Sequence, residues 1–106
     1  MNYYAIMNTI KAHTEETYER LVEAFKNRLG QVEKQPGFRT LIVLENREKK
    51  ELKILVIWRS RQDFEKWLES RVFLEAHTRA RGKISRGAES VGEEYRVLEL
   101  VGGEKD

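Results

Sequence analysis

Two apolar segments, Phe38 to Glu45 and Leu52 to Trp58, constrain the fold of this chain more than any other feature. Both are rich in β-branched and aromatic residues, and the polar run Asn46 to Lys50 separates them, which predicts an antiparallel hairpin. Neither segment alternates cleanly between apolar and polar residues, although a sheet with one face in water should do so. The pattern therefore indicates a sheet that is covered on both faces.

Strict alternation along the first segment predicts that Phe38, Ile42 and Leu44 share one face of the sheet and that Leu41 and Val43 share the other. Helices can cover only one of these faces. A second copy of the same chain is the economical cover for the other face, so we expect a homodimer joined through its sheets. A long loop is the alternative cover, but the long loop expected in this chain is basic.

Two helices are expected between the strands. Thr14 can cap the first helix, whose apolar residues from Tyr18 to Val32 recur at spacings of three and four until Pro36-Gly37 ends it. Ser60 to Asp63 resembles a capping box and begins the second helix, which Ser70 restarts after a bend.

The remaining segments complete the predicted order. Tyr3 to Ile10 reads as a first strand, Thr78 to Gly92 as a basic loop, and Tyr95 to Val101 as a final strand before a frayed tail, 102–106. Strand, helix, strand, strand, helix, strand is the ferredoxin-like order. The fold class predicted is therefore α+β, an antiparallel sheet with helices on one face.

Size and composition exclude several classes of protein. A chain of 106 residues is expected to be one domain, residues 1–106. Its 20 basic and 18 acidic residues give a net charge of +2, which does not indicate a nucleic-acid partner. The absence of cysteine excludes disulfides, thiolate haem ligands and iron–sulfur clusters. With no signal peptide and no membrane-length apolar run in view, we expect a cytoplasmic protein without a membrane partner.

Three residues are candidates for a functional site, and each has an ordinary structural alternative. His77 follows Phe73 and Leu74 on one helix face, and it is either a haem-iron ligand or a histidine at the edge of the core. Trp67 shares a face with Phe64 and Leu68 and either fills the core or forms the wall of a pocket for a flat cofactor. Asn8 shares its strand face with Ile6 and Ile10, although asparagine is depleted in strands. It is either exposed near a strand end or an amide aimed into a pocket.

A basic run follows His77 directly, and it comprises Arg79, Arg81, Lys83 and Arg86. Solvated charge is the ordinary explanation, and contact with RNA is a second one. Positive charge beside an apolar pocket also suits carboxylates at the rim of a cofactor. The sequence contains no glycine-rich phosphate loop, no nucleophile paired with a base and no metal-binding group of histidines and acids.

The segment Ile54 to His77, ILVIWRSRQDFEKWLESRVFLEAH, resembles the signature region of the antibiotic biosynthesis monooxygenase domains, which are dimeric α+β barrel proteins. The resemblance extends from about Tyr4 to Gly82 and is greatest to the haem-degrading monooxygenases of the IsdG type. Their Asn–Trp–His trio is matched by Asn8, Trp67 and His77.

This resemblance implies a role for each matched residue. His77 would be the proximal iron ligand, Trp67 would push the porphyrin out of plane, and Asn8 would donate a hydrogen bond on the distal side. Phe64, Phe73 and Arg81 are expected to complete the cofactor contacts. Dioxygen and an external electron donor, supplied by an unidentified reductase or reductant, would then open the ring and release iron.

Two other functions are open at this point. The chain could be a cofactor-independent monooxygenase of a quinol or another aromatic, in which His77 and Asn8 bind or deprotonate a phenol. It could also be a haem carrier or sensor without catalytic activity.

Overall fold

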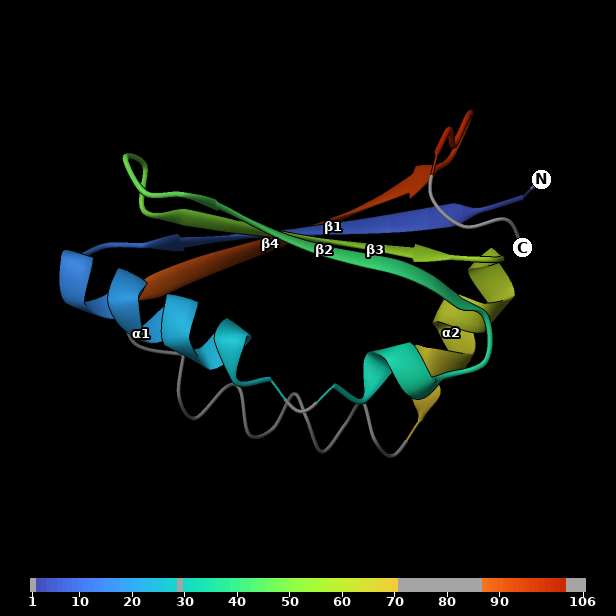
Figure 1. Ribbon diagram of the computed structural model, residues 1–106, viewed down its shortest axis with the longest axis horizontal. Coiled ribbons are helices and arrows are strands. Elements are labelled where there is room, and N and C mark those ends of the chain that lie inside the picture. Colours follow the sequence, from blue (N-terminus) through green and yellow to red (C-terminus); the bar gives the residue numbers. More distant parts are fainter. Residues whose placement is uncertain (1, 29, 71–86, 103–106) are drawn as a thin grey trace.

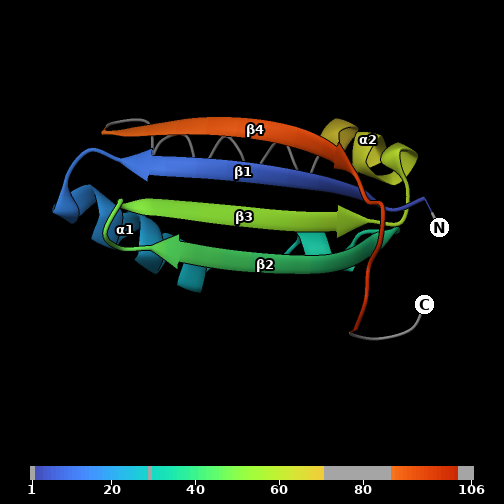
Figure 2. The same cartoon turned by 90° about the horizontal axis from the view of Figure 1, so that it is seen from above.

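The computed structural model describes residues 2–28, 30–70 and 87–102. Within them, four strands form one antiparallel sheet in the order β2-β3-β1-β4, and two α-helices lie on one face of it (Figures 1 and 2). The elements are β1 (Tyr4–Ala12), α1 (Glu15–Lys26), the 3-10 turn η1 (Val32–Lys34), β2 (Phe38–Asn46), β3 (Glu51–Trp58), α2 (Arg61–Glu69) and β4 (Ala88–Arg96). The predicted ferredoxin-like α+β fold is confirmed.

Both predicted helix caps are present. The Thr14 hydroxyl accepts a hydrogen bond of 3.1 Å from the Thr17 N–H, and Ser60 accepts one of 3.1 Å from the Asp63 N–H. The Ser60 hydroxyl also donates to the Asp63 carboxylate at 2.9 Å. These bonds satisfy N–H groups that the first turn of each helix would otherwise leave without partners.

The first helix is shorter than predicted. It ends at Lys26, and Val32 belongs to η1 rather than to the helix. Two residues explain the early end. At the C-cap, the Asn27 side chain donates to the Glu23 carbonyl oxygen at 3.0 Å, and three residues later Gly30 adopts a φ of 71°, a left-handed conformation that a continued helix could not contain. The apolar spacing continues past this point, so periodicity alone extends the helix too far.

The predicted position of the last strand was also wrong. β4 runs from Ala88 to Arg96, whereas the sequence predicted a loop to Gly92 and a strand from Tyr95 to Val101. β4 is rich in glutamate and contains a glycine, so its local preference for a strand is weak. Its conformation comes from pairing with β1 along its whole length, from Ala88 opposite Ala12 to Arg96 opposite Tyr4.

A register shift in β2 corrects the predicted faces. Phe38 pairs with Trp58 and Leu41 pairs with Val56, with an irregularity between Phe38 and Thr40. One extra residue moves every later side chain to the opposite face. Phe38 therefore lies on the helix side, with its ring edge-on to Trp58 at a centroid distance of 6.3 Å. Ile42 and Leu44 lie on the outer face instead of sharing the face of Phe38.

The two helices cover opposite ends of the same sheet face (Figure 1). α1 packs Tyr18 and Leu21 into a core that includes residues of β1 and β3, namely Ile10, Ala12, Leu52 and Ile54. α2 packs Phe64 and Trp67 against Trp58 at the end of β3, where Trp58 is only 1% exposed. The middle of β1 thus lies between the two helical contacts.

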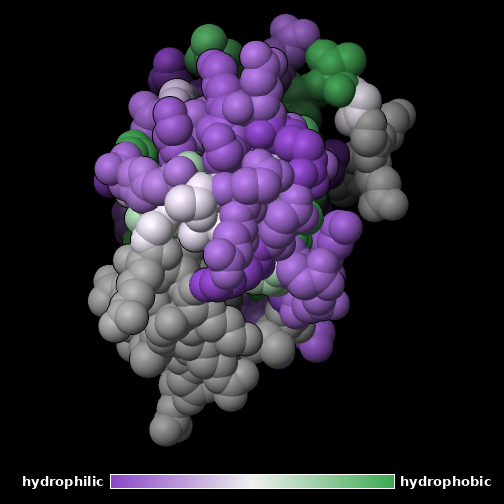
Figure 3. Space-filling model, turned by 90° about the vertical axis from the view of Figure 1, so that its left-hand side faces the viewer, coloured by the Kyte–Doolittle hydropathy of each residue, from purple (hydrophilic) through white to green (hydrophobic). Residues whose placement is uncertain are grey.

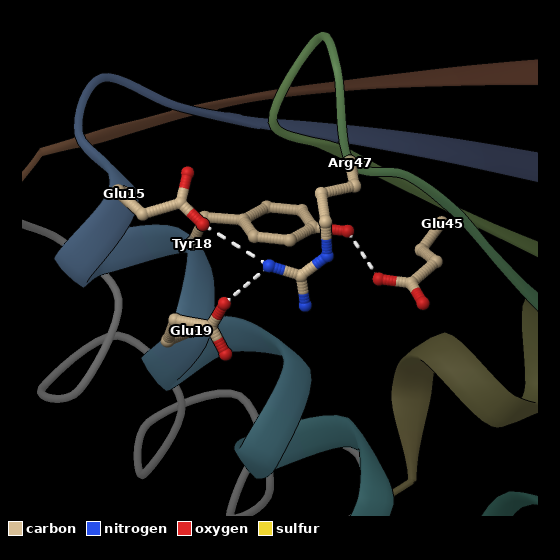
Figure 4. Close-up of polar contacts among 5 residues, drawn as sticks. All are labelled: Glu15, Tyr18, Glu19, Glu45 and Arg47. Carbon is tan, nitrogen blue, oxygen red and sulfur yellow. Dashed lines mark hydrogen bonds and ion pairs between the residues drawn. The ribbon is translucent and has the colours of Figure 1, made fainter.

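A polar cluster holds α1 against the β2–β3 hairpin (Figure 4). The buried Tyr18 donates its phenol hydrogen to Glu45, and the Arg47 guanidinium lies 5.2 Å from the centre of the Tyr18 ring. Arg47 also forms ion pairs with Glu15, at 3.0 Å, and with Glu19. Hydrophilic side chains cover this end of the molecule, as Figure 3 shows. Burial and the bond to Glu45 raise the pKa of Tyr18 to about 12.

Tyr18→Phe is predicted to lower the free energy of unfolding by about 1 kcal/mol at pH 7, because the Glu45 carboxylate loses its hydrogen-bond donor. The pKa of Tyr18 is higher in the folded protein than its ordinary value of 10, so its contribution is present below pH 10 and is lost as the pH rises from 10 to about 12. Urea unfolding at pH 7 and across this alkaline range measures both effects.

The variant should therefore lose less stability than the parent between pH 10 and 12. Tyr4 and Tyr95, whose pKa values are also raised, are present in both proteins and cancel in the comparison. An equal alkaline loss in the two proteins would contradict the assignment to Tyr18.

Candidate active site

Asn8 lies in the middle of β1, paired with Ile54 of β3 on one side and Gly92 of β4 on the other. It shares its face with Ile10, which packs against α1, and with Tyr4, whose ring centre is 6.1 Å from that of Phe64 in α2. Asn8 is therefore on the helix side of the sheet, between the two helices. It is partly buried, and it is far from either end of its strand.

The Asn8 amide makes no hydrogen bond within the part of the chain that the structure describes. An asparagine side chain carries two donor hydrogens and one acceptor oxygen, and a partly buried amide without partners is costly unless water or a ligand satisfies it. Its neighbours on β4 leave this side open, because Ser90, Gly92 and Glu94 are exposed. The geometry provides a polar group on the helix-side face that is available to a bound molecule.

Trp67 is placed by an aromatic cluster. Its ring centre is 6.3 Å from that of Trp58, and the two planes are inclined by 32°. Trp58 in turn contacts Phe64 at 6.4 Å and Phe38 at 6.3 Å. Trp67 itself is only partly buried. One side of the indole thus rests on a tightly packed ring, and part of it remains accessible.

The backbone of α2 is fixed close to Trp67. The helix begins at the Ser60 cap, and at its other end the Ser70 hydroxyl donates to the Trp67 carbonyl oxygen at 2.7 Å. The face expected from the sequence is only partly formed, since Phe64 and Trp67 enter the aromatic cluster while Leu68 is 37% exposed. Capping at both ends holds the indole at a defined position relative to β3.

The sequence analysis missed the residues that support Phe64 and Trp67. Tyr4 and Trp58 are cross-strand partners, and both face α2. Tyr4 also donates a hydrogen bond of 2.5 Å to Glu94, and this bond raises the pKa of its phenol. Aromatic residues at the paired ends of β1 and β3, directly before a capped helix, were the available signal.

Three predicted site residues, Phe73, His77 and Arg81, lie outside the described residues, as does the rest of the basic run. The proposed helix restart after Ser70 lies there too. Their roles stay predictions. Within the described ranges, Asn8 and the pair of Phe64 and Trp67 lie on the same side of the sheet.

The described residues show neither a metal-binding cluster nor a membrane-spanning helix. They contain no group of three or more histidine, cysteine, aspartate or glutamate side chains that could hold a metal ion. Among the same residues, neither helix has the length and apolarity needed to cross a membrane.

Comparison with known proteins identifies the class. Residues 3–79 match the antibiotic biosynthesis monooxygenase family, so the chain belongs to this family and the resemblance noted in the sequence is confirmed. The family consists of monooxygenases, and the expectation of an oxidoreductase is confirmed with it.

Among curated proteins, the chain is similar to heme oxygenase (staphylobilin-producing) 1 of Staphylococcus aureus (strain Newman). The two are 40% identical over 73 residues, which are 66% of this chain and 67% of the relative.

Solved structures share the fold. SnoaB, a cofactor-independent oxygenase from Streptomyces nogalater, superposes with a TM-score of 0.71 at 17% identity, over 95% of this chain and 98% of that one. MhuD, a heme-degrader from Mycobacterium tuberculosis with two hemes bound in its active site, superposes with a TM-score of 0.72 at 23% identity, over 93% and 99%. At such identities these likenesses establish the fold alone.

Proposed function

We propose that this protein is a haem-degrading monooxygenase that binds haem through His77 and opens the porphyrin with dioxygen and external electrons, releasing iron. The observation that carries the proposal is the Asn8 amide, which lies without a hydrogen-bond partner in the described residues on the same side of the sheet as Trp67. The 40% identical relative, named a heme oxygenase, supports haem as the substrate.

The described residues fit a flat, mostly apolar substrate with one polar centre. Trp67 and Phe64 offer aromatic surface from α2, and Asn8 offers the polar group from β1. Apolar walls with a few placed polar groups are typical of cofactor sites. Phe73 would extend the apolar wall, and Arg81 would pair with a propionate carboxylate.

Bound haem supplies redox-active iron and is itself the molecule that is oxidised. The neutral imidazole of His77 would hold the iron from one side of the ring. Asn8 would donate an amide hydrogen to the bound molecule. Trp67 would press on the ring, and the buried Trp58 behind it gives the indole a firm support.

The outer face of the sheet supports a homodimer, which is part of this proposal. Ile42, Leu44, Val91 and Tyr95 lie there and are between 40% and 60% exposed. The segment after β4 crosses this side at one end only (Figure 2), where the outward-facing pair Ala5 and Ile57 is buried. Lys53 and Glu93 lie among these apolar residues on the same face. A group of exposed apolar residues on one sheet face marks an interaction surface, and a second copy presents the matching one.

A second candidate function rests on the family, whose fold also serves cofactor-independent oxygenases such as SnoaB. In that case Asn8 and His77 would bind a phenolic substrate and haem would not bind. The cytoplasmic location and the reductase partner expected from the sequence stay predictions under either function.

His77→Ala is predicted to abolish tight haem binding, because the iron loses its only proposed protein ligand. The measurement is a titration of the protein with haem, followed at the Soret band. His13→Ala is the matched control, since His13 is the other histidine of the chain and its side chain is 52% exposed beside Glu89. Equal affinity of the His77→Ala variant and the parent would refute the proposed ligand.

Trp67→Ala is predicted to keep haem binding within a few-fold and to slow ring opening by about tenfold or more, the effect of losing an interaction made chiefly during the reaction. Trp67→Phe keeps an aromatic ring against Trp58, so its rate of ring opening should lie between those of Trp67→Ala and the parent protein. Single-turnover rates under air with ascorbate measure this, and circular dichroism verifies folding. Full turnover in Trp67→Ala would contradict a role in ring distortion.

Ile42→Glu is predicted to convert the dimer into monomers, because it places an unpaired carboxylate among the exposed apolar residues of the outer face. Gln62→Glu makes the same change in charge on the exposed side of α2 and should leave the dimer intact. Sedimentation velocity gives the mass of each variant. A monomeric parent protein at micromolar concentration would contradict the dimer.

A further inference from the structure

Gly92 occupies the middle of an edge strand, where glycine weakens a strand because it has the most conformational entropy to lose. The backbone gives no reason for it. The glycines with positive φ are elsewhere, and Gly92 is not among them, so other residues could adopt its conformation. The reason for a glycine at this position must be sought in the space beside it.

That space contains one neighbouring group. A Cβ atom built on Gly92 would lie 2.8 Å from Oδ1 of Asn8, closer than real Cβ atoms approach, and no other atom of the described residues, the two chain neighbours aside, lies within 4 Å of it. Gly92 is the cross-strand partner of Asn8. Of the side chains that the structure describes, a methyl group at this position would therefore meet the Asn8 amide alone.

We propose that Gly92 is a positioning residue for Asn8, which lets the amide lean toward β4 and so sets the direction in which it meets a ligand. On its other side Asn8 pairs with Ile54, which is buried and bulky, so the glycine side is the one that leaves room for the amide within the sheet. That the ligand is haem rests on the proposed function. The control of the amide by Gly92 is independent of that function.

A methyl group at position 92 should make the Asn8 side chain change to another rotamer rather than shift slightly within its present one. Asparagine turns about two torsions, and its first torsion occupies discrete staggered wells. Because Oδ1 is the free end of a side chain, Asn8 can move away without disturbing the sheet. Gly92→Ala should therefore fold normally and melt at the same or a higher temperature, since alanine restricts the unfolded chain.

The first test uses the haem-free protein. The side-chain amide resonances of Asn8 are assigned by their absence from Asn8→Ala in ¹H–¹⁵N spectra. Gly92→Ala should shift these resonances with no loss in melting temperature. Ser90→Ala, a small change two residues away on the same face, should leave them in place. Unchanged Asn8 resonances in Gly92→Ala, or a large fall in melting temperature, would overturn the proposal.

The second test uses the haem-loaded protein and a double-mutant cycle. Gly92→Ala should slow ring opening by about tenfold at saturating haem, the effect expected for one misdirected hydrogen bond. In the Asn8→Ala background the same change should have no further effect. A loss that persists in that background would show that the methyl group obstructs the ligand directly, which would refute the positioning role.

The two tests separate this inference from the proposed function. If the parent protein binds no haem, the proposed function fails, yet the spectra of the haem-free variants still decide whether Gly92 directs the amide. If haem binds and the Asn8 resonances are indifferent to Gly92→Ala, the proposed function stands and the inference fails.

Discussion

Pairing of β1 with a neighbour on each side is the constraint on which the rest of the structure depends. Each of its residues from Tyr4 to Lys11 faces a partner on β3 and another on β4, so the side on which each β1 residue lies is fixed twice. A slip of one residue would turn Ile10 and Ala12 away from α1 and Tyr4 away from α2. The same register brings Asn8 to the helix side. Core packing and site geometry are thus set by one set of backbone hydrogen bonds.

The division of the helix side explains why the Asn8 amide, which has no partner among the described residues, is tolerated there. α1 and α2 bury the two ends of this face, each with its own core contacts. Between them lies Asn8, beside a strand whose helix-side residues are exposed and whose glycine leaves room for the amide. Because the helices supply these contacts at the two ends, the amide between them is not needed for the packing of either helix.

The sequence predicted most of the fold because its strongest local signals agree with the tertiary structure. Short local segments of the sequence are enough to predict the β2–β3 hairpin and the helix caps at Thr14 and Ser60. What it missed depends on pairing with a distant strand or on local features without a strong sequence signal. β4 has little strand preference of its own and follows β1, the irregularity after Phe38 shows no signature, and α1 ends where Asn27 bonds back to Glu23. For the site, resemblance supplied Asn8 and Trp67, but only cross-strand pairing reveals that Gly92 and Trp58 stand beside them.

We propose that haem binds between Asn8 and Trp67 and is consumed there. The direct measurement is to load the parent protein with haem, add ascorbate under air, and quantify the iron released per haem against a sample kept without oxygen. We expect the sample in air to lose its Soret band and to release nearly one iron per haem. The sample kept without oxygen should do neither. A haem spectrum that persists with no iron released would indicate a carrier, and a failure to bind haem at all would contradict the account at its base.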